Sequence, residues 1–262
     1  KIVNAGYVLQ HLPDVKKEGL KGGIVYTDGQ FDDARLALNL AQTASEHGAA
    51  VINYCRVTGF IFSGHNVTGV IAEDVLTNKQ YHLKAKAVIN ATGVFADVLM
   101  KAANDNSASI APSQGVHIVV DKKHFAGTDA LMIPKTTDGR VLFAVPWHNK
   151  VIVGTTDTAV NNTAIEPAST EEEINFIISN FNQYAALPIS KKDVLSVFTG
   201  LRPLIKKERA KSTAALNRHH AVFVSPSGLI TVTGGKWTTY RSMAEHTIDK
   251  AIQTAGLQYR IC

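Results

Sequence analysis

The spacing of apolar residues changes character along this chain of 262 residues, and that change most constrains the fold. Residues 22–93 combine strand-like runs with a helical pattern at 31–49. Within them, 65–85 alternates like a hairpin with Asn78 at its turn, and 86–93 is expected to form a buried strand that runs into a glycine turn. After about residue 112, short apolar runs alternate with polar turns, which is typical of an antiparallel sheet. A strand followed by a helix returns near the end. We therefore predict a mixed α/β and α+β fold with two interleaved domains.

Two segments have the spacing of amphipathic helices. The first, 31–49, would begin at Asp32 or Asp33 and end at Gly48. Its expected buried face consists of Ala34, Leu38, Ala41 and Ser45. The second, 169–187, would begin with a capping box and end before Pro188. That capping box is expected from Ser169 and Glu172, and its apolar stripe from Ile174, Ile177, Phe181 and Tyr184.

Composition narrows the class of protein. No stretch approaches the roughly 20 apolar residues of a membrane span. Cys55 and Cys262 lie far apart without metal-ligand spacing, which favours reduced thiols in a cytosolic protein. Part of the net charge of +5 comes from the basic run 206–211. That run is either a solvated loop or a positive surface for an anionic substrate or acidic lipid. Nucleic acid is not an expected partner, because the basic residues are not interleaved with aromatic ones.

The junction Gly234-Gly235-Lys236 joins an apolar strand to an amphipathic helix. Glycines expose the backbone, and a helix N-terminus carries unpaired N–H groups and partial positive charge. With a lysine added, this junction suits a phosphate or a negative charge on a flat ring. The alternative is a tight turn with a solvated lysine. The junction is not a P-loop, and GxGxxG occurs nowhere in the chain.

Several motifs carry a family resemblance that runs in order along nearly all of the chain. They are GGIVYTDGQFDDARL, INATG, QGVHIVV, FAVPW followed by VIVGTTD, TGLRPL and GGKWTTYRSMAEH. The sequence strongly resembles FAD-dependent glycerol-3-phosphate dehydrogenases, and TGLRPL followed by GGKWTTYR is the specific part. The resemblance implies a D-amino-acid-oxidase-like, two-domain flavoprotein fold. It also suggests that the N-terminal GxGxxG unit and the C-terminal helical cap domain of the family are absent here.

The resemblance implies a division of the chain. Residues 28–111 and 217–262 would be the remainder of the FAD-binding domain. Residues 1–27 and 112–216 would form a substrate-binding domain built on an antiparallel sheet with helices.

The resemblance also implies an activity for a longer parent protein. That protein would oxidise sn-glycerol 3-phosphate to dihydroxyacetone phosphate by hydride transfer to FAD and pass the electrons to a quinone. It would be cytoplasmic, with peripheral contact to the membrane. The chain alone, without GxGxxG, is expected to bind FAD weakly and to be inactive. Two alternatives remain open: an oxidase that uses oxygen, and a non-catalytic anion-binding domain of the same fold.

Site residues follow from the matching motifs. His117 would be the base for the hydroxyl proton, and Arg202 would polarise the alkoxide or bind the phosphate. Lys236 would lie beside the substrate or the flavin, and Arg218 would be a second phosphate ligand. Cofactor contacts are expected from Val57 at the adenine end, and from Thr92, Gly93, Gly234, Gly235 and Thr238. No metal site is expected. Thr155, Thr156 and Asp157 are interpreted as turn residues, although the resemblance implies that this segment lies near the wall of the active site.

Overall fold

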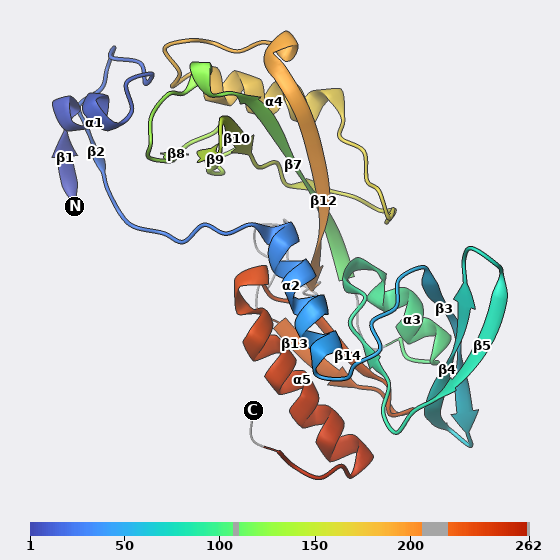
Figure 1. Cartoon of the computed structure of the whole chain (residues 1–262). Helices are drawn as coiled ribbons and strands as arrows, with labels where there is room; N and C mark the ends of the chain where they lie inside the picture. The colour runs from blue at the N-terminus through green and yellow to red at the C-terminus, as the bar shows by residue number, and fades with distance from the viewer. Residues whose placement is uncertain (107–109, 206–219, 261–262) are drawn as a thin grey trace. The chain divides into compact units, whose positions relative to one another are not determined.

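The computed structural model describes residues 1–106, 110–205 and 220–260 (Figure 1). The chain divides into two compact units, and each unit combines two separate stretches of sequence. Unit 1 comprises Lys1–Asp28 and Pro112–Arg202. Unit 2 comprises Gly29–Ala111 and Pro203–Cys262. The assignment of the two parts to substrate and cofactor stays a prediction.

Unit 1 is built on a mainly antiparallel sheet with the strand order β11-β7-β10-β9-β8, and β12 pairs with the other side of β7 (Figure 1). Short apolar runs between polar turns form these strands, as the spacing predicts. The register places Gly154 opposite His117 on neighbouring strands. The strands are β7 (Ile110–Asp121), β8 (Leu131–Ile133), β9 (Leu142–Trp147), β10 (Lys150–Gly154), β11 (Thr158–Ala159) and β12 (Val194–Ile205).

Helix α4 (Glu171–Asn182) packs its apolar stripe on this sheet, with Ile177 and Phe181 fully buried. The predicted capping box was one residue too early. Thr170 caps the helix, and its backbone N–H donates to the Glu173 carboxylate at 3.0 Å. The sequence Ser-Thr-Glu-Glu-Glu offers two registers for the box, and the structure selects the one that buries Glu173. The helix also ends at Asn182, earlier than Pro188 suggested.

The N-terminal stretch of unit 1 adds short elements at the sheet's edge. β1 (Ile2–Asn4) pairs with β2 (Gly22–Ile24), and α1 (Ala5–His11) lies between them in sequence. Val15 forms an isolated bridge with Ala185 after α4, so this stretch joins the main core. Two 3₁₀ turns complete the unit: η2 (Lys122–His124) and η3 (Lys191–Asp193).

Unit 2 contains a small sheet of order β13-β14-β6. β13 (His220–Val224) is antiparallel to β14 (Ile230–Gly234), whereas β6 (Ile89–Asn90) is parallel to it. β6 is shorter than the strand expected at 86–93, because only Ile89 and Asn90 find partners on β14. Helical segments follow both parallel strands. These are η1 (Gly93–Phe95) and α3 (Ala96–Ala102) after β6, and η5 (Trp237–Thr239) and α5 (Tyr240–Ala255) after β14.

A second sheet in unit 2 has the order β3-β4-β5. Its strands are β3 (Cys55–Ser63), β4 (Asn66–Asp74) and β5 (Lys79–Lys84). The hairpin predicted at 65–85 is therefore present, and its turn holds Asn78 with φ of 58°. A small core of Phe60, Val67, Ala103 and Leu229 ties this sheet to α3 and β14.

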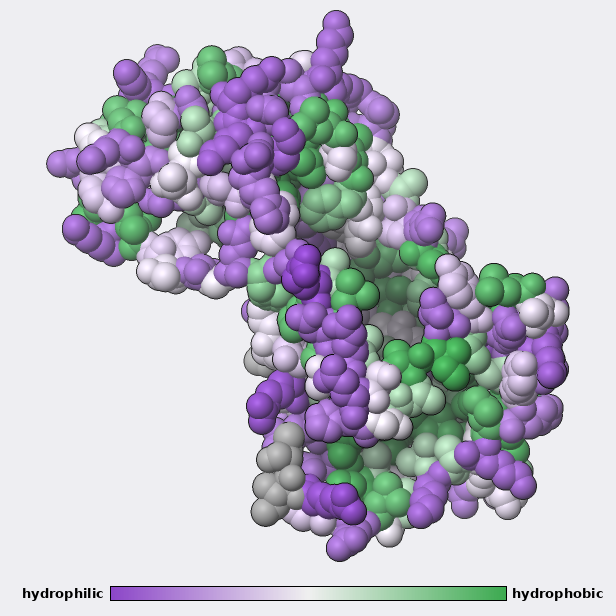
Figure 2. All heavy atoms as spheres, in the orientation of Figure 1, coloured by the Kyte–Doolittle hydropathy of each residue, from purple (hydrophilic) through white to green (hydrophobic). Residues whose placement is uncertain are grey.

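Helix α2 (Asp33–Glu46) begins where predicted, since the Asp32 carboxylate accepts from the Arg35 backbone N–H at 2.9 Å. The predicted buried face was wrong, because the helix buries no residue and Leu38 is 65% exposed. Its half-buried residues are Leu36, Leu40, Ala41 and Ala44. Figure 2 shows apolar side chains reaching the surface among polar ones. In unit 2 the exposed apolar residues include Leu38, Val51, Ile52 and Val98.

Candidate functional site

The His117 ring lies half-buried on β7 between two flat neighbours. On one side the Phe198 ring of β12 stacks on it, with centroids 4.9 Å apart and planes at 8°. On the other side lies Gly154, where an added Cβ would come within 2.3 Å of the His117 Cδ2 atom. The ring is thus sandwiched between an aromatic side chain and bare backbone.

Both ring nitrogens of His117 are without a hydrogen bond to any residue that the structure describes. Burial, and to a smaller extent the positive charge of Arg202, lower the pKa of His117 from 6.5 to about 4. The imidazole is therefore neutral at neutral pH and has a lone pair available to accept a proton.

Arg202, near the end of β12, is held beside this imidazole by contacts with residues 155–157. It donates through Nη2 to the Thr155 hydroxyl at 2.9 Å and through Nη1 to the Thr156 carbonyl at 3.2 Å. The Asp157 carboxylate lies 3.9 Å from the same guanidinium. Gly115 leaves room for this guanidinium, since an added Cβ would come within 2.3 Å of Arg202 Nη2. The Arg202 side chain remains 34% exposed and can meet a ligand.

A buried polar network supports the segment that holds Arg202. The Glu173 carboxylate accepts from Gln114 at 2.7 Å, from Thr158 at 2.8 Å and from Thr156 at 3.2 Å. Thr156 in turn accepts from the Val116 backbone N–H at 3.0 Å. Sequence reasoning assigned 155–157 to turn chemistry and missed this supporting role. The run of three hydroxyl- or carboxyl-bearing residues directly after a buried strand was the available signal.

A second group of predicted residues gathers in unit 2. β6 and β14 are parallel and paired at Thr231 and Asn90, so their carboxyl ends open at the same edge of the sheet. Thr92 and Gly93 follow β6, and the Gly234–Thr238 turn follows β14. In parallel arrangements this edge is where ligands bind. The structure therefore brings together the cofactor-binding candidates Thr92, Gly93, Gly234, Gly235 and Thr238, with Lys236 exposed among them.

Gly93 and Gly235, two of the glycines at this edge, have different surroundings. Gly93 has φ of 59° and open space where a Cβ would stand, so its backbone can be approached by a ligand. Gly235 has φ of 75°, and an added Cβ would come within 2.6 Å of the Met243 Sδ atom on α5. Gly235 therefore allows close packing of the turn on α5, which the sequence analysis did not anticipate. Bare backbone at these turns fits a flat, anionic cofactor.

The remaining candidates lie elsewhere. Val57 pairs with Ala72 on the β3-β4-β5 sheet, next to a bulge before Gly59. Arg218 and the basic run 206–211 lie outside the described residues. Of the charged candidates, His117 and Arg202 belong to unit 1 and Lys236 to unit 2.

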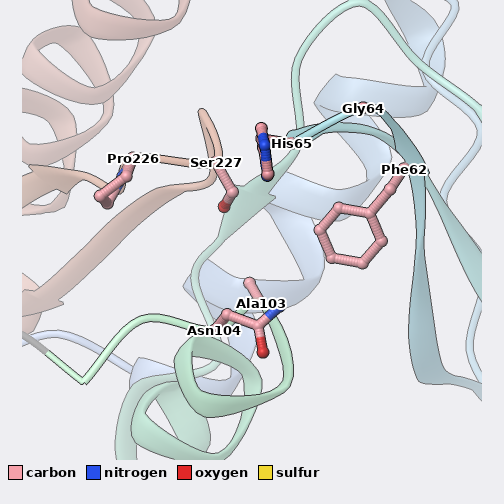
Figure 3. Close-up of a pocket in the computed structure, with 7 residues that line it drawn as sticks. All are labelled: Phe62, Gly64, His65, Ala103, Asn104, Pro226 and Ser227. Carbon is pink, nitrogen blue, oxygen red and sulfur yellow. The ribbon is translucent and has the colours of Figure 1, made fainter.

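One pocket in the described part of the chain is lined by none of these residues. It has a volume of about 290 Å³ and lies where three turns of unit 2 meet (Figure 3). Its lining consists of Phe62, Gly64, His65, Ala103, Asn104, Pro226 and Ser227. None of the predicted site residues contributes to it. Among the described residues no cluster of three or more histidine, cysteine or acidic side chains could hold a metal ion.

A neutral imidazole beside a guanidinium, together with bare turns at the carboxyl ends of parallel strands, indicates a flavin-dependent oxidoreductase. The family described as FAD dependent oxidoreductase matches residues 1–241, and the chain belongs to this family. The predicted fold class is confirmed, and FAD is the cofactor of the family.

Within this family, the chain is similar to proteins named glycerol-3-phosphate dehydrogenase. The mitochondrial glycerol-3-phosphate dehydrogenase of Mesocricetus auratus is 42% identical over 270 residues, which cover 100% of this chain and 37% of the relative. That of Homo sapiens is 41% identical over 266 residues, or 98% of this chain and 36% of the relative. The chain thus spans little more than a third of these relatives.

Solved structures agree with this family. The glycerol-3-phosphate dehydrogenase from Bacillus halodurans, complexed with FAD, is 35% identical and matches with a TM-score of 0.90. The match covers 100% of this chain and 51% of that one. Glycine oxidase from Bacillus cereus is 17% identical with a TM-score of 0.72, over 99% of this chain and 66% of that one, and shows the same fold.

Proposed function

We propose that the protein carrying this chain oxidises sn-glycerol 3-phosphate to dihydroxyacetone phosphate with FAD as hydride acceptor. The observation that carries the proposal is the pairing of a neutral His117 with a partly exposed Arg202 in one unit. The relatives named glycerol-3-phosphate dehydrogenase, which match the chain over nearly its whole length, support the substrate.

The proposed oxidation would use His117, Arg202 and FAD for different parts of the reaction. Oxidising a secondary alcohol releases a hydride from carbon and a proton from the hydroxyl. FAD, when bound, accepts the hydride. A ring nitrogen of His117 takes the hydroxyl proton, for which its neutral state is required. The Arg202 guanidinium binds the phosphate or stabilises the oxygen as negative charge develops on it.

Unit 2 would hold the flavin. Thr92, Gly93, Gly234, Gly235 and Thr238 would offer backbone and hydroxyl contacts at the common strand edge. Lys236 would place a positive charge beside the reduced ring, because its side chain is exposed at that turn. Val57 would contact the adenine end through its backbone, and Arg218 would be the second phosphate ligand.

Quinone is the proposed electron acceptor, and the protein would meet it through peripheral contact with a membrane from the cytoplasmic side. The part of the chain that the structure describes has no helix of the length and apolarity needed to cross a bilayer. Several relatives are named as mitochondrial, so cell fractionation of the source organism tests the compartment directly.

The experiment is a pair of assays on the flavin-loaded protein that carries this chain. Sn-glycerol 3-phosphate should bleach the flavin under anaerobic conditions, whereas glycerol without the phosphate should not. A soluble quinone should then restore the oxidised spectrum without stoichiometric hydrogen peroxide. Equal reduction by glycerol would contradict the substrate, and peroxide formation matching turnover would favour the oxidase alternative.

A further inference from the structure

A histidine that acts as a base is usually oriented by a hydrogen bond from its second nitrogen, often to a carboxylate. His117 lacks such a partner among the described residues. The charged groups near it are the Arg202 guanidinium and, beyond that, the Asp157 carboxylate, which lies 3.9 Å from the guanidinium. Something other than a carboxylate must therefore fix the ring.

The stacked neighbour is the group that can do so. The Phe198 and His117 rings are stacked with nearly parallel planes, at 8°, and centroids 4.9 Å apart. Gly154 closes the opposite face of the imidazole. These contacts restrict rotation of the ring about its Cβ–Cγ bond. Phe198 is itself 46% exposed.

We propose that Phe198 is a positioning residue for the His117 base: its ring holds the imidazole against the Gly154 backbone and excludes water from one face. The catalytic part of this inference rests on the proposed function. The stacking of Phe198 on His117 can be tested without measuring turnover.

The same contact should contribute to the burial that favours the neutral state of His117. Burial is the largest cause of its lowered pKa, and the Phe198 ring covers one face of the imidazole. No acidic partner among the described residues offsets this effect. Removing the Phe198 ring should therefore raise the pKa of His117 toward its ordinary value of 6.5.

The first test uses the chain with isotope-labelled histidine and follows the His117 ring by NMR during a pH titration. In the wild type, this resonance should be shifted by the Phe198 ring current and should titrate near pH 4. Phe198→Ala should abolish the ring-current shift and raise the pKa, while Phe198→Tyr should preserve both. If Phe198→Ala fails to fold, Phe198→Leu keeps the bulk and should still lose the ring-current shift.

Leu195→Ala is the matched control, because Leu195 is also an exposed apolar residue of β12 and should leave His117 unchanged. An unchanged His117 resonance in both Phe198→Ala and Phe198→Leu would overturn the inference, as would an equal response to Leu195→Ala.

The second test measures flavin reduction by sn-glycerol 3-phosphate. Phe198→Ala should slow the limiting rate about tenfold with little change in substrate Kd, and more strongly at pH 6 than at pH 8. Phe198→Tyr should restore the rate. A wild-type rate and pH profile in Phe198→Ala would overturn the positioning role. The expected NMR response in a protein that is not reduced by this substrate would support the positioning and contradict the proposed function instead.

Discussion

Gly115 and Gly154 stand at positions on neighbouring strands where a side chain would displace a candidate site residue. An added Cβ would meet the Arg202 guanidinium at the first position and the His117 ring at the second, in both cases at 2.3 Å. Neither role was visible in the sequence, because a glycine within a strand pattern indicates only some close approach. In both cases the side chain that approaches the glycine comes from a different strand.

Replacing Gly154 with alanine should therefore disturb both stability and the site. We expect Gly154→Ala to lower the free energy of unfolding by about 1–3 kcal/mol, as overpacking does, and to shift the His117 resonance. Urea denaturation and NMR measure the two effects. Gly200→Ala is the control, because no atom lies within 4 Å of its added Cβ, and it should change stability by less than about 0.5 kcal/mol. Equal effects of the two substitutions would contradict this packing.

The lowered pKa of His117 predicts how stability depends on pH. The folded state holds His117 neutral down to about pH 4, while the unfolded chain protonates it near 6.5. Between these values the unfolded state binds more protons, so acidification destabilises the fold. From pH 7 to pH 4, wild type should lose up to about 3 kcal/mol more than His117→Gln, at 1.36 kcal/mol per pKa unit. Parallel stability curves for the two proteins would show that His117 titrates normally.

At the scale of elements, α4 does more than cover the sheet. Its first turn carries Glu173, whose buried carboxylate joins the helix cap to Gln114 on β7 and to the Thr156 and Thr158 hydroxyls. The Glu173 carboxylate thus accepts hydrogen bonds from the start of α4, from β7 and from the segment that binds Arg202. Burial raises the pKa of Glu173, but hydrogen bonds led by the Thr170 backbone N–H outweigh this and lower it overall.

Glu173→Gln should lower the free energy of unfolding at pH 7 by about 1–3 kcal/mol, because one oxygen cannot serve all these donors. The difference from wild type should shrink as pH falls below the ordinary Glu value of 4.5, since the unfolded carboxylate is then protonated while the folded one, with its lowered pKa, stays charged to lower pH. Thermal or urea unfolding across pH measures this. Glu171→Gln, at a 68% exposed side chain paired with Lys191, should cost under about 1 kcal/mol. A larger loss for Glu171→Gln would contradict the network.

Elements with strong internal periodicity could be predicted from the sequence, as the α4 stripe and the β4–β5 hairpin show. Features set by distant partners could not. β6 is short because its pairing depends on β14, about 140 residues later in the chain. The buried face predicted for α2 was wrong because the residues that pack against this helix cannot be read from its own sequence pattern. The sequence likewise indicated His117 and Arg202 through motifs, whereas the Phe198 stack required the pairing of β12 with β7.

At the scale of the whole molecule, the chain holds two sets of functional groups in two compact units. Unit 1 carries the proposed base His117 and the Arg202 guanidinium, and unit 2 carries the glycine-rich turns and Lys236. The proposed reaction needs both sets. Because no GxGxxG segment is present in the 262 residues, we expect this chain alone to bind FAD weakly and to be inactive. A yellow preparation with stoichiometric FAD would contradict that expectation.

Lys236→Ala tests the contribution of unit 2 in the flavin-loaded protein. We expect the rate of flavin reduction to fall about tenfold, because a nearby cation stabilises the negative charge of the reduced ring. FAD affinity should change less, within about threefold, since the turn's backbone makes the other contacts. Stopped-flow spectroscopy and FAD titration measure the two quantities. Unchanged reduction kinetics would remove Lys236 from the site.

The most direct measurement of the central claim is single-turnover reduction of the flavin by sn-glycerol 3-phosphate in wild type, His117→Gln and Arg202→Lys. The account predicts a limiting rate at least about 100-fold lower in His117→Gln with substrate Kd nearly unchanged. It predicts at least about tenfold weaker substrate binding in Arg202→Lys, which loses the bidentate contact. Wild-type rates in His117→Gln, together with wild-type binding in Arg202→Lys, would contradict it.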